Sequence, residues 1–119
     1  MRGIRGAINV QENTATAIGE ATRKLLLAMI DENNIETGEL ISVFFTVTGD
    51  LNAAFPAATA REIKGWNLVP MLCAVEMAVP GSMDKCIRVL MLTRTNKNQR
   101  QIKHIYLGEA ANLRPDLDQ

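Results

Sequence analysis

The order of apolar patterns along the chain restricts its fold more than any other feature, because one long helical pattern lies among several short strand patterns. Residues 2–10 alternate between an apolar face and a face that carries Arg5, which is the period of a strand. From Asn13 or Thr14 onward, apolar residues recur at helical spacing until about residues 33–34. The pattern predicts a strand followed by an amphipathic helix that covers a sheet.

The rest of the chain is predicted to add four strands and one short helix. Residues 39–48 are rich in β-branched and aromatic side chains and run into a Gly-Asp turn, which is typical of a strand. Pro56 can begin a helix that passes Arg61 and ends at Gly65. The three remaining strands are expected at residues 68–79, 86–95 and 103–107.

These elements predict a single α+β domain over residues 1–119, with a mixed five-stranded sheet covered by two helices. Such a small sheet has one helical layer, so its other face needs cover, and self-association through that face is expected. The tail after Gly108 is expected to hold one helical turn, and Pro115 disfavours helix at Arg114. From about residue 113 onward we expect the tail to be mobile.

Charge and composition exclude several classes of partner. Thirteen Lys and Arg residues balance thirteen Asp and Glu residues, so the basic excess of a nucleic-acid or anionic-membrane binder is missing. No apolar run approaches the ~20 residues that cross a bilayer, and the best one, residues 68–75, contains Pro70. The N-terminus lacks the apolar core of a secretory signal, so a cytoplasmic location is expected. Cys73 and Cys86 are expected to be reduced thiols.

The motifs of cofactor and metal enzymes are missing. His104 is the only histidine, which excludes metal sites built from several histidines, and we expect it to be a surface or supporting residue. The sequence contains no dinucleotide-binding GxGxxG, no phosphate-binding P-loop and no GxSxG nucleophile elbow. No cofactor and no metal are therefore expected.

Arginine within apolar segments is the informative anomaly. Arg88 lies in the strand pattern CIRVLML, on the face opposite Ile87 and Val89. An unpaired guanidinium there is costly, so it must meet a carboxylate or line a polar cleft. Glu76, the lone acid of an apolar stretch, is a partner for a buried ion pair or a ligand contact. Alternatively, two arginines from different strands could hold a small dicarboxylate.

Arg5 and Tyr106 are two further candidates. Arg5 lies on a face of small Gly and Ala neighbours, which leaves space for a ligand, although a charge on an edge strand is an equal alternative. Tyr106 is the only tyrosine, and core packing with a satisfied hydroxyl is its default explanation.

Six ordered segments together resemble a known family, the monofunctional α/β class of chorismate mutase. They are RGIRGA at 2–7, DLNAAFPA at 50–57 with Arg61, Cys73 with Glu76, CIRV at 86–89, HIYL at 104–107 and LRPDL at 113–117. The resemblance implies a homotrimer whose strands form a pseudo-α/β barrel, with three active sites between subunits. It also implies conversion of chorismate to prephenate, on the route to phenylalanine and tyrosine, without a cofactor or covalent intermediate.

The same resemblance implies roles for individual residues. Arg88 would donate to the ether oxygen of the breaking bond and to a carboxylate, and Arg5 and Tyr106 would hold the other carboxylate region. Glu76 and the backbone of Cys73 would contact the ring hydroxyl. The remaining substrate-binding residues would be Phe55, Ala57, Arg61, Leu72, Ala74, Val75, Leu113 and Arg114, some from across the subunit boundary. Ala58 stands where relatives can carry lysine, and Leu72 replaces a small polar residue, so charge at the cleft entrance is expected to differ.

Three other functions compete with this interpretation. A small trimeric enamine or imine deaminase would explain the size and Arg88, but not Arg5, Glu76 and Tyr106 together. A non-catalytic binder of an aromatic-pathway carboxylate would bind without turnover. In a purely structural trimer, Arg88 and Glu76 would be only an ion pair.

Overall fold

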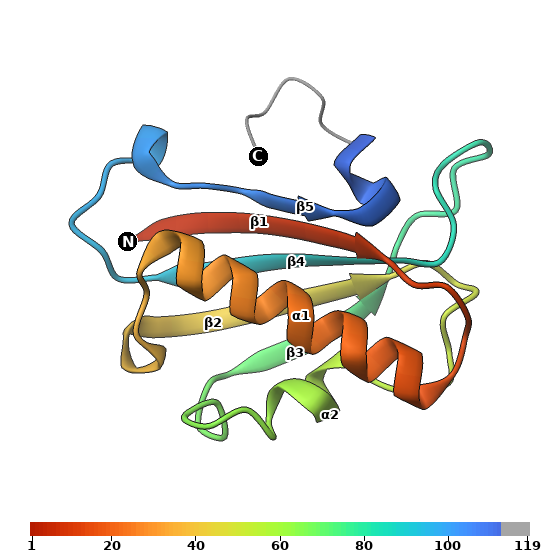
Figure 1. Ribbon diagram of the computed structural model, residues 1–119, viewed down its shortest axis with the longest axis horizontal. Helices are drawn as coiled ribbons and strands as arrows, with labels where there is room; N and C mark the ends of the chain where they lie inside the picture. The colour runs from red at the N-terminus through yellow and green to blue at the C-terminus, as the bar shows by residue number, and fades with distance from the viewer. Residues whose placement is uncertain (113–119) are drawn as a thin grey trace.

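A computed structural model describes residues 1–112 of the 119-residue chain (Figure 1). Five strands form one sheet in the order β3-β2-β4-β1-β5. Their bounds are β1 Arg2–Asn9, β2 Leu40–Val47, β3 Met71–Val75, β4 Cys86–Thr93 and β5 Ile105–Leu107. The helices are α1 Ala15–Asn33 and α2 Pro56–Ala60, with short 3₁₀ turns at Thr37–Glu39, Gln99–Gln101 and Gly108–Asn112. The predicted α+β fold with a mixed five-stranded sheet and two helices is confirmed.

The centre of the sheet is β4, which is antiparallel to both of its neighbours. Its pairing with β1 runs from Arg2 opposite Thr93 to Asn9 opposite Cys86, and β2 flanks its other side. The outer pairs, β1 with β5 and β2 with β3, are parallel. Because β5 lies outside β1, Arg5 is on an internal strand, and its interpretation as an edge-strand charge is wrong.

Helix α1 covers one face of the sheet, as its amphipathic pattern predicts. The Thr14 hydroxyl caps its first turn by accepting a hydrogen bond from the N–H of Ala17, and Asn34 ends it in the left-handed conformation with φ 54°. Its buried side chains, including Leu25 and Met29, pack on the inward residues of the strands. Figure 1 shows α1 crossing in front of β1, β4 and β2.

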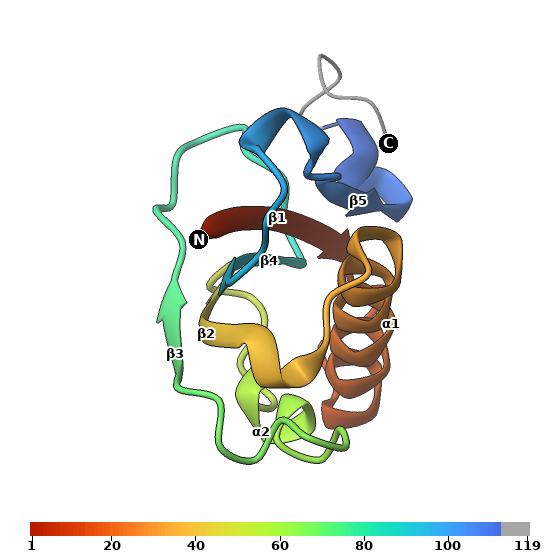
Figure 2. The same cartoon turned by 90° about the vertical axis from the view of Figure 1, so that its left-hand side faces the viewer.

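The second helix extends the same layer at the β3 end of the sheet. Pro56 occupies the first turn, where its missing N–H costs nothing, and Ala57 and Ala60 are buried in the core. Figure 2 shows that no helix of residues 1–112 lies over the opposite face of the sheet, which we call the helix-free face. Large apolar side chains remain exposed on that face, namely Phe44, Leu72 and Leu90. The expectation that one face needs further cover is consistent with this surface.

Several predicted boundaries are wrong. Helix α2 ends at Ala60 rather than near Gly65, which instead forms a turn with φ 89° packed against Thr37. The strand predicted at 68–79 is only β3, because turns lead up to Pro70 and because the partner strand β2 ends at Val47. The strands predicted at 86–95 and 103–107 also lose their outer residues. The helical turn predicted after Gly108 is confirmed as the 3₁₀ turn Gly108–Asn112, and the mobility predicted from about residue 113 concerns residues outside the described ones.

Within residues 1–112, no helix combines the length and apolar character that a membrane span requires.

Gly6 allows α1 to lie close to the sheet. A Cβ at this position would be 2.5 Å from Met29 Sδ and 3.2 Å from Leu25 Cδ1. We expect Gly6→Ala to reduce the free energy of unfolding by about 1–3 kcal/mol, because an extra methyl group overpacks the core. Urea denaturation measures this change. Gly38→Ala is the matched control, since a Cβ at Gly38 has nothing within 4 Å, and equal stability of the two variants would contradict the close packing.

Candidate active site

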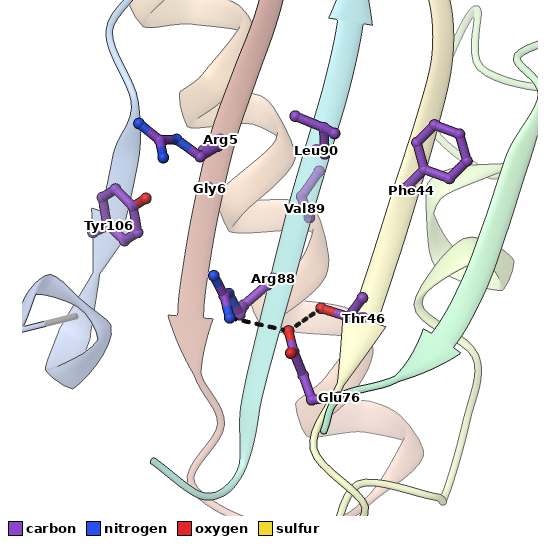
Figure 3. Close-up of a pocket in the computed structure, with 9 residues that line it drawn as sticks. All are labelled: Arg5, Gly6, Phe44, Thr46, Glu76, Arg88, Val89, Leu90 and Tyr106. Atoms are coloured by element: carbon purple, nitrogen blue, oxygen red, sulfur yellow. Dashed lines mark hydrogen bonds and ion pairs between the residues drawn. The ribbon is translucent and has the colours of Figure 1, made fainter. Parts of the chain in front are cut away.

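A cleft of about 370 Å³ opens on the helix-free face of the sheet (Figure 3). Its walls combine charged, aromatic and aliphatic side chains from four strands and from the segment that follows β3. The lining residues are Arg5, Gly6, Phe44, Thr46, Glu76, Arg88, Val89, Leu90 and Tyr106. The four residues that the sequence singles out for chemistry, Arg5, Glu76, Arg88 and Tyr106, therefore line one cleft.

Arg88 projects into this cleft from the middle of β4. Its neighbours Ile87 and Val89 are buried in the core, so strand alternation turns Arg88 to the opposite face, as predicted. The residues directly across from it are Ala7 on β1 and Thr46 on β2. Pairing on both sides fixes the backbone of Arg88, and the small Ala7 leaves room beside its long side chain.

Glu76 is the ion-pair partner of Arg88. One carboxylate oxygen, Oε2, lies 3.3 Å from Arg88 Nη1 and also accepts a hydrogen bond from the Thr46 hydroxyl. The Arg88 side chain is 52% exposed and that of Glu76 is 23% exposed. The predicted ion pair is therefore present, but the prediction that it is buried is wrong. The pair lies in an open cleft, where a ligand can reach both charges.

Arg5 and Tyr106 occupy the other end of the cleft. Figure 3 shows their side chains close together, with the Tyr106 hydroxyl turned toward β1. Tyr106 is 6% exposed and packs with Ala7, Cys86 and Ala110 in a small cluster on this side of the sheet. The predicted core packing of Tyr106 is thus combined with a position at the cleft wall.

Two arginines and one glutamate give the cleft lining a net charge of +1 among the described residues. A guanidinium presents a planar donor fork that matches a carboxylate. Arg88 has part of its donor capacity committed to Glu76, and the backbone N–H of Arg5 donates to Nδ1 of His104. The arrangement can bind an anionic ligand and hold a second polar group of that ligand near Glu76.

A second hollow of about 430 Å³ collects other predicted site residues, and it shares no lining residue with the cleft. Phe55, Cys73, Ala74 and Val75 line it. The side chain of Phe55 is 71% exposed there. The structure therefore does not bring this group to the cleft within one described chain.

The remaining predicted site residues are spread around these two hollows. Arg61 is exposed at the end of α2, and Ala57 is buried beneath it in the same helix. Leu72 is exposed on the helix-free face beside Phe44, its partner in the β2–β3 register. Leu113 and Arg114 lie outside the described residues.

Thr46 is a cleft residue that sequence reasoning missed. Its hydroxyl fixes the Glu76 carboxylate, and its backbone lies opposite Arg88. The signal was present, because Thr46 is a polar residue between the buried Phe45 and Val47 and so shares the face of Phe44. Only the pairing of β2 with β4 shows that this face of β2 lies beside Arg88.

Cys86 borders the cleft residues without the character of a nucleophile. Both cysteines are free, as expected, and Cys86 is 2% exposed. Burial raises the pKa of the Cys86 thiol to about 11, although the nearby Arg88 charge works in the other direction. Among residues 1–112, no three His, Cys, Asp or Glu side chains gather in a way that could hold a metal ion.

Known proteins resemble this chain along nearly its whole length. Residues 1–117 match the family model described as chorismate mutase type I. Chorismate mutase AroH of Thermus thermophilus is 54% identical over 119 residues, which cover 99% of this chain and 97% of that protein. Chorismate mutase AroH of Bacillus subtilis is 44% identical over 117 residues, with coverage of 98% and 92%.

The fold is similar to that of a solved protein as well. The structure of a chorismate mutase from Clostridium thermocellum superposes with a TM-score of 0.91 and 47% sequence identity. The match covers 94% of this chain and 99% of that chain. Sequence and fold therefore indicate the same family over the same residues.

The raised pKa of Cys86 predicts slow alkylation of the native protein. At pH 8, a thiol with a pKa of about 11 is about one part in a thousand thiolate, and the thiolate is the reactive form. In a Cys73→Ser variant, we expect iodoacetamide to modify Cys86 about 100-fold more slowly in the native state than in urea. The native rate should rise about tenfold per pH unit between pH 7 and 9. Native and unfolded rates that agree within a factor of three would contradict the assignment.

Proposed function

This chain belongs to the chorismate mutase type I family and is a chorismate mutase, and we propose that it converts chorismate to prephenate in the cleft of Arg5, Glu76, Arg88 and Tyr106. The product would serve phenylalanine and tyrosine synthesis. The observation that carries the choice of site is the meeting of these four side chains in one cleft on the helix-free face. A deaminase that uses Arg88 alone would not explain why Arg5, Glu76 and Tyr106 line the same cleft.

In the proposed mechanism, Arg88 stabilises the charge that develops in the transition state. The rearrangement breaks a C–O bond ahead of C–C bond formation, so negative charge grows on the ether oxygen and positive charge grows on the ring. A guanidinium fixed at that oxygen binds the transition state more tightly than the substrate. The backbone of Arg88 is held by strands on both sides, and Glu76 holds one of its nitrogens. Little reorganisation is then needed during the reaction.

The other cleft residues orient the substrate. Arg5 and Tyr106, at the opposite end of the cleft from Glu76, would hold a carboxylate. Glu76 would face the ring and its hydroxyl, with its carboxylate fixed by Thr46. Gripping both ends of the molecule keeps the flexible enolpyruvyl arm folded over the ring, which lowers the entropic part of the barrier. The reaction requires no proton transfer and no cofactor, so the side chains act by position and charge alone.

We further propose that the protein works as a homotrimer with sites shared between subunits. The exposed Phe44, Leu72 and Leu90 give the helix-free face an apolar surface that association would cover. Phe55 and Arg61 are exposed and are not lining residues of the cleft of their own chain. The family resemblance implies that both residues bind substrate. We propose that they do so in the cleft of a neighbouring subunit, together with Leu113 and Arg114.

The setting of the reaction is also part of the proposal. We propose a cytoplasmic location, because both cysteines are free thiols, as is typical of a reducing compartment. Residues 1–119 are proposed to form one domain, since one continuous core includes residues from β1 through β5.

Replacing Arg88 tests the mechanism against a structural role. We expect Arg88→Ala to lower kcat for chorismate by about 10²- to 10³-fold, because a transition-state donor is lost. Since the Arg88 side chain is 52% exposed, the free energy of unfolding should change by less than about 1 kcal/mol. Assays of prephenate formation and urea denaturation measure the two effects.

Arg94→Ala is the matched control for this experiment, since Arg94 is an exposed arginine just beyond the end of β4. Its kcat should equal that of the unmodified protein. A loss of ~3–5 kcal/mol in stability on Arg88→Ala, with unchanged kcat, would make the pair structural. No conversion by the folded unmodified protein would favour a non-catalytic binder.

Mixed oligomers test whether sites are shared between subunits. Arg88→Ala and Arg61→Ala chains should each be nearly inactive alone. Co-expressed in equal amounts, they should regain about a quarter of the unmodified activity, because a random trimer joins an intact Arg88 to an intact neighbouring Arg61 at one site in four.

The control mixture combines Arg88→Ala with Glu76→Gln, whose positions lie in the same cleft of one chain. No intact cleft forms in that mixture, so its activity should stay low. Sedimentation equilibrium should give the mass of a trimer. Failure of the first mixture to exceed the control would place Arg61 outside a shared site.

A further inference from the structure

Strand β5 carries Tyr106 but is attached to the sheet by a short ladder. It has three residues, and its parallel register with β1 pairs Gly6 with Ile105, Ala7 with Tyr106 and Ile8 with Leu107. A ladder this short specifies register weakly, and a slip of one residue would turn Tyr106 to the other face. Something beyond the ladder must therefore hold Tyr106 beside Arg5.

The first residue before β5 supplies one such attachment. The backbone N–H of Arg5 donates a 2.9 Å hydrogen bond to Nδ1 of His104. A side chain thus takes the place of a ladder acceptor at the point where the ladder begins, one residue before Gly6 and Ile105. The bond joins the backbone of one cleft residue, Arg5, to the strand that carries another, Tyr106.

The other end of β5 has a similar attachment. Asn9, the last residue of β1, accepts a 2.8 Å hydrogen bond from the N–H of Glu109 through its Oδ1. Gly108 between Leu107 and Glu109 has φ 60°, and a Cβ at Gly108 would collide with Asn9 Oδ1. Position 108 therefore requires glycine for two reasons: the backbone is left-handed, and the Asn9 amide approaches it closely.

We propose that His104 and Asn9 are positioning residues that fix the register of β5 on β1 and so place Tyr106 beside the Arg5 guanidinium. This inference rests on the proposed function, since it gives that pair of residues the task of holding a substrate carboxylate. His104 and Asn9 are not among the residues that line the cleft, so they act through Arg5 and Tyr106.

The positions of the two attachments predict a particular kinetic signature. The carboxylate held by Arg5 and Tyr106 has the same charge in substrate and transition state, and Arg88 and Glu76 still orient the reacting part of the substrate in these variants. A partial weakening of the carboxylate contact therefore raises KM while leaving kcat nearly unchanged. Loss of Arg88 acts in the opposite way, because its contact strengthens in the transition state. A variant that only destabilised the fold would not be expected to raise KM selectively while leaving kcat unchanged.

The test compares His104→Leu with His104→Asn, which keeps an acceptor oxygen close to the position of Nδ1. With one hydrogen bond lost, we expect His104→Leu to raise KM for chorismate about fivefold with kcat within twofold. His104→Asn should restore KM to within about twofold of the unmodified value. Asn9→Ala, at the other end of the strand, should raise KM in the same direction.

Gln99→Ala is the matched control. Gln99 Nε2 donates a 2.8 Å hydrogen bond to the carbonyl of Gly3, so it also links β1 to the segment before β5, but away from the cleft. Its KM should stay within twofold of the unmodified value. Backbone amide exchange measured by NMR should show the Arg5 N–H exchanging faster in His104→Leu and protected again in His104→Asn.

Binding of prephenate, measured by calorimetry, separates the two proposals because it needs no turnover. About fivefold weaker prephenate binding by His104→Leu, restored in His104→Asn, supports the positioning role even if chorismate is not converted. Equal KM and equal prephenate affinity in folded His104→Leu and unmodified protein would overturn it, whatever the rate of conversion. Absence of prephenate binding by the unmodified protein would overturn both the site and the positioning role.

Discussion

The alternation of side chains along β4 is the constraint on which the rest of the structure depends. Ile87, Val89 and Met91 point into the core, and burying side chains of this kind stabilises a fold by about 1.5–3 kcal/mol each. A one-residue slip of β4 would exchange them for Arg88 and Leu90 and would bury a guanidinium among aliphatic groups. The core therefore fixes the register, and the register places Arg88 on the helix-free face.

The ion pair at that face contributes more to order than to stability. Exposed pairs stabilise a fold by at most about 1 kcal/mol, because water screens the charges. Glu76 nevertheless accepts from Thr46 while facing Arg88, so three side chains from two strands and the segment after β3 restrict one another. A charged group that is already oriented need not reorganise when charge develops beside it. The stability of the scaffold and the geometry of the site are thus supplied by opposite faces of one sheet.

Local patterns were sufficient for much of this arrangement. The alternation around Arg5 and Arg88 predicted the faces that both side chains occupy, and the helix is capped by Thr14, one of its two predicted starting residues. The length of β3 was missed, because a strand ends where its partner ends, and the end of β2 is a distant property of the sequence. The meeting of Arg5 with Tyr106 depends on a parallel pairing between residues about a hundred positions apart, which no local period encodes.

The reaction proposed for this cleft explains why such a simple set of side chains is adequate. A pericyclic rearrangement needs no nucleophile or proton shuttle, so the buried Cys86 thiol, whose pKa is raised to about 11, can serve as packing beside Tyr106. What the reaction does need is charge held at fixed points around a folded substrate. Internal strands supply fixed points better than loops, because the backbone of an internal strand is paired on both sides. Arg5 and Arg88 stand on paired, internal strands, whereas Tyr106 stands on the short edge strand, and there the side chains of His104 and Asn9 add the hydrogen bonds that the ladder lacks.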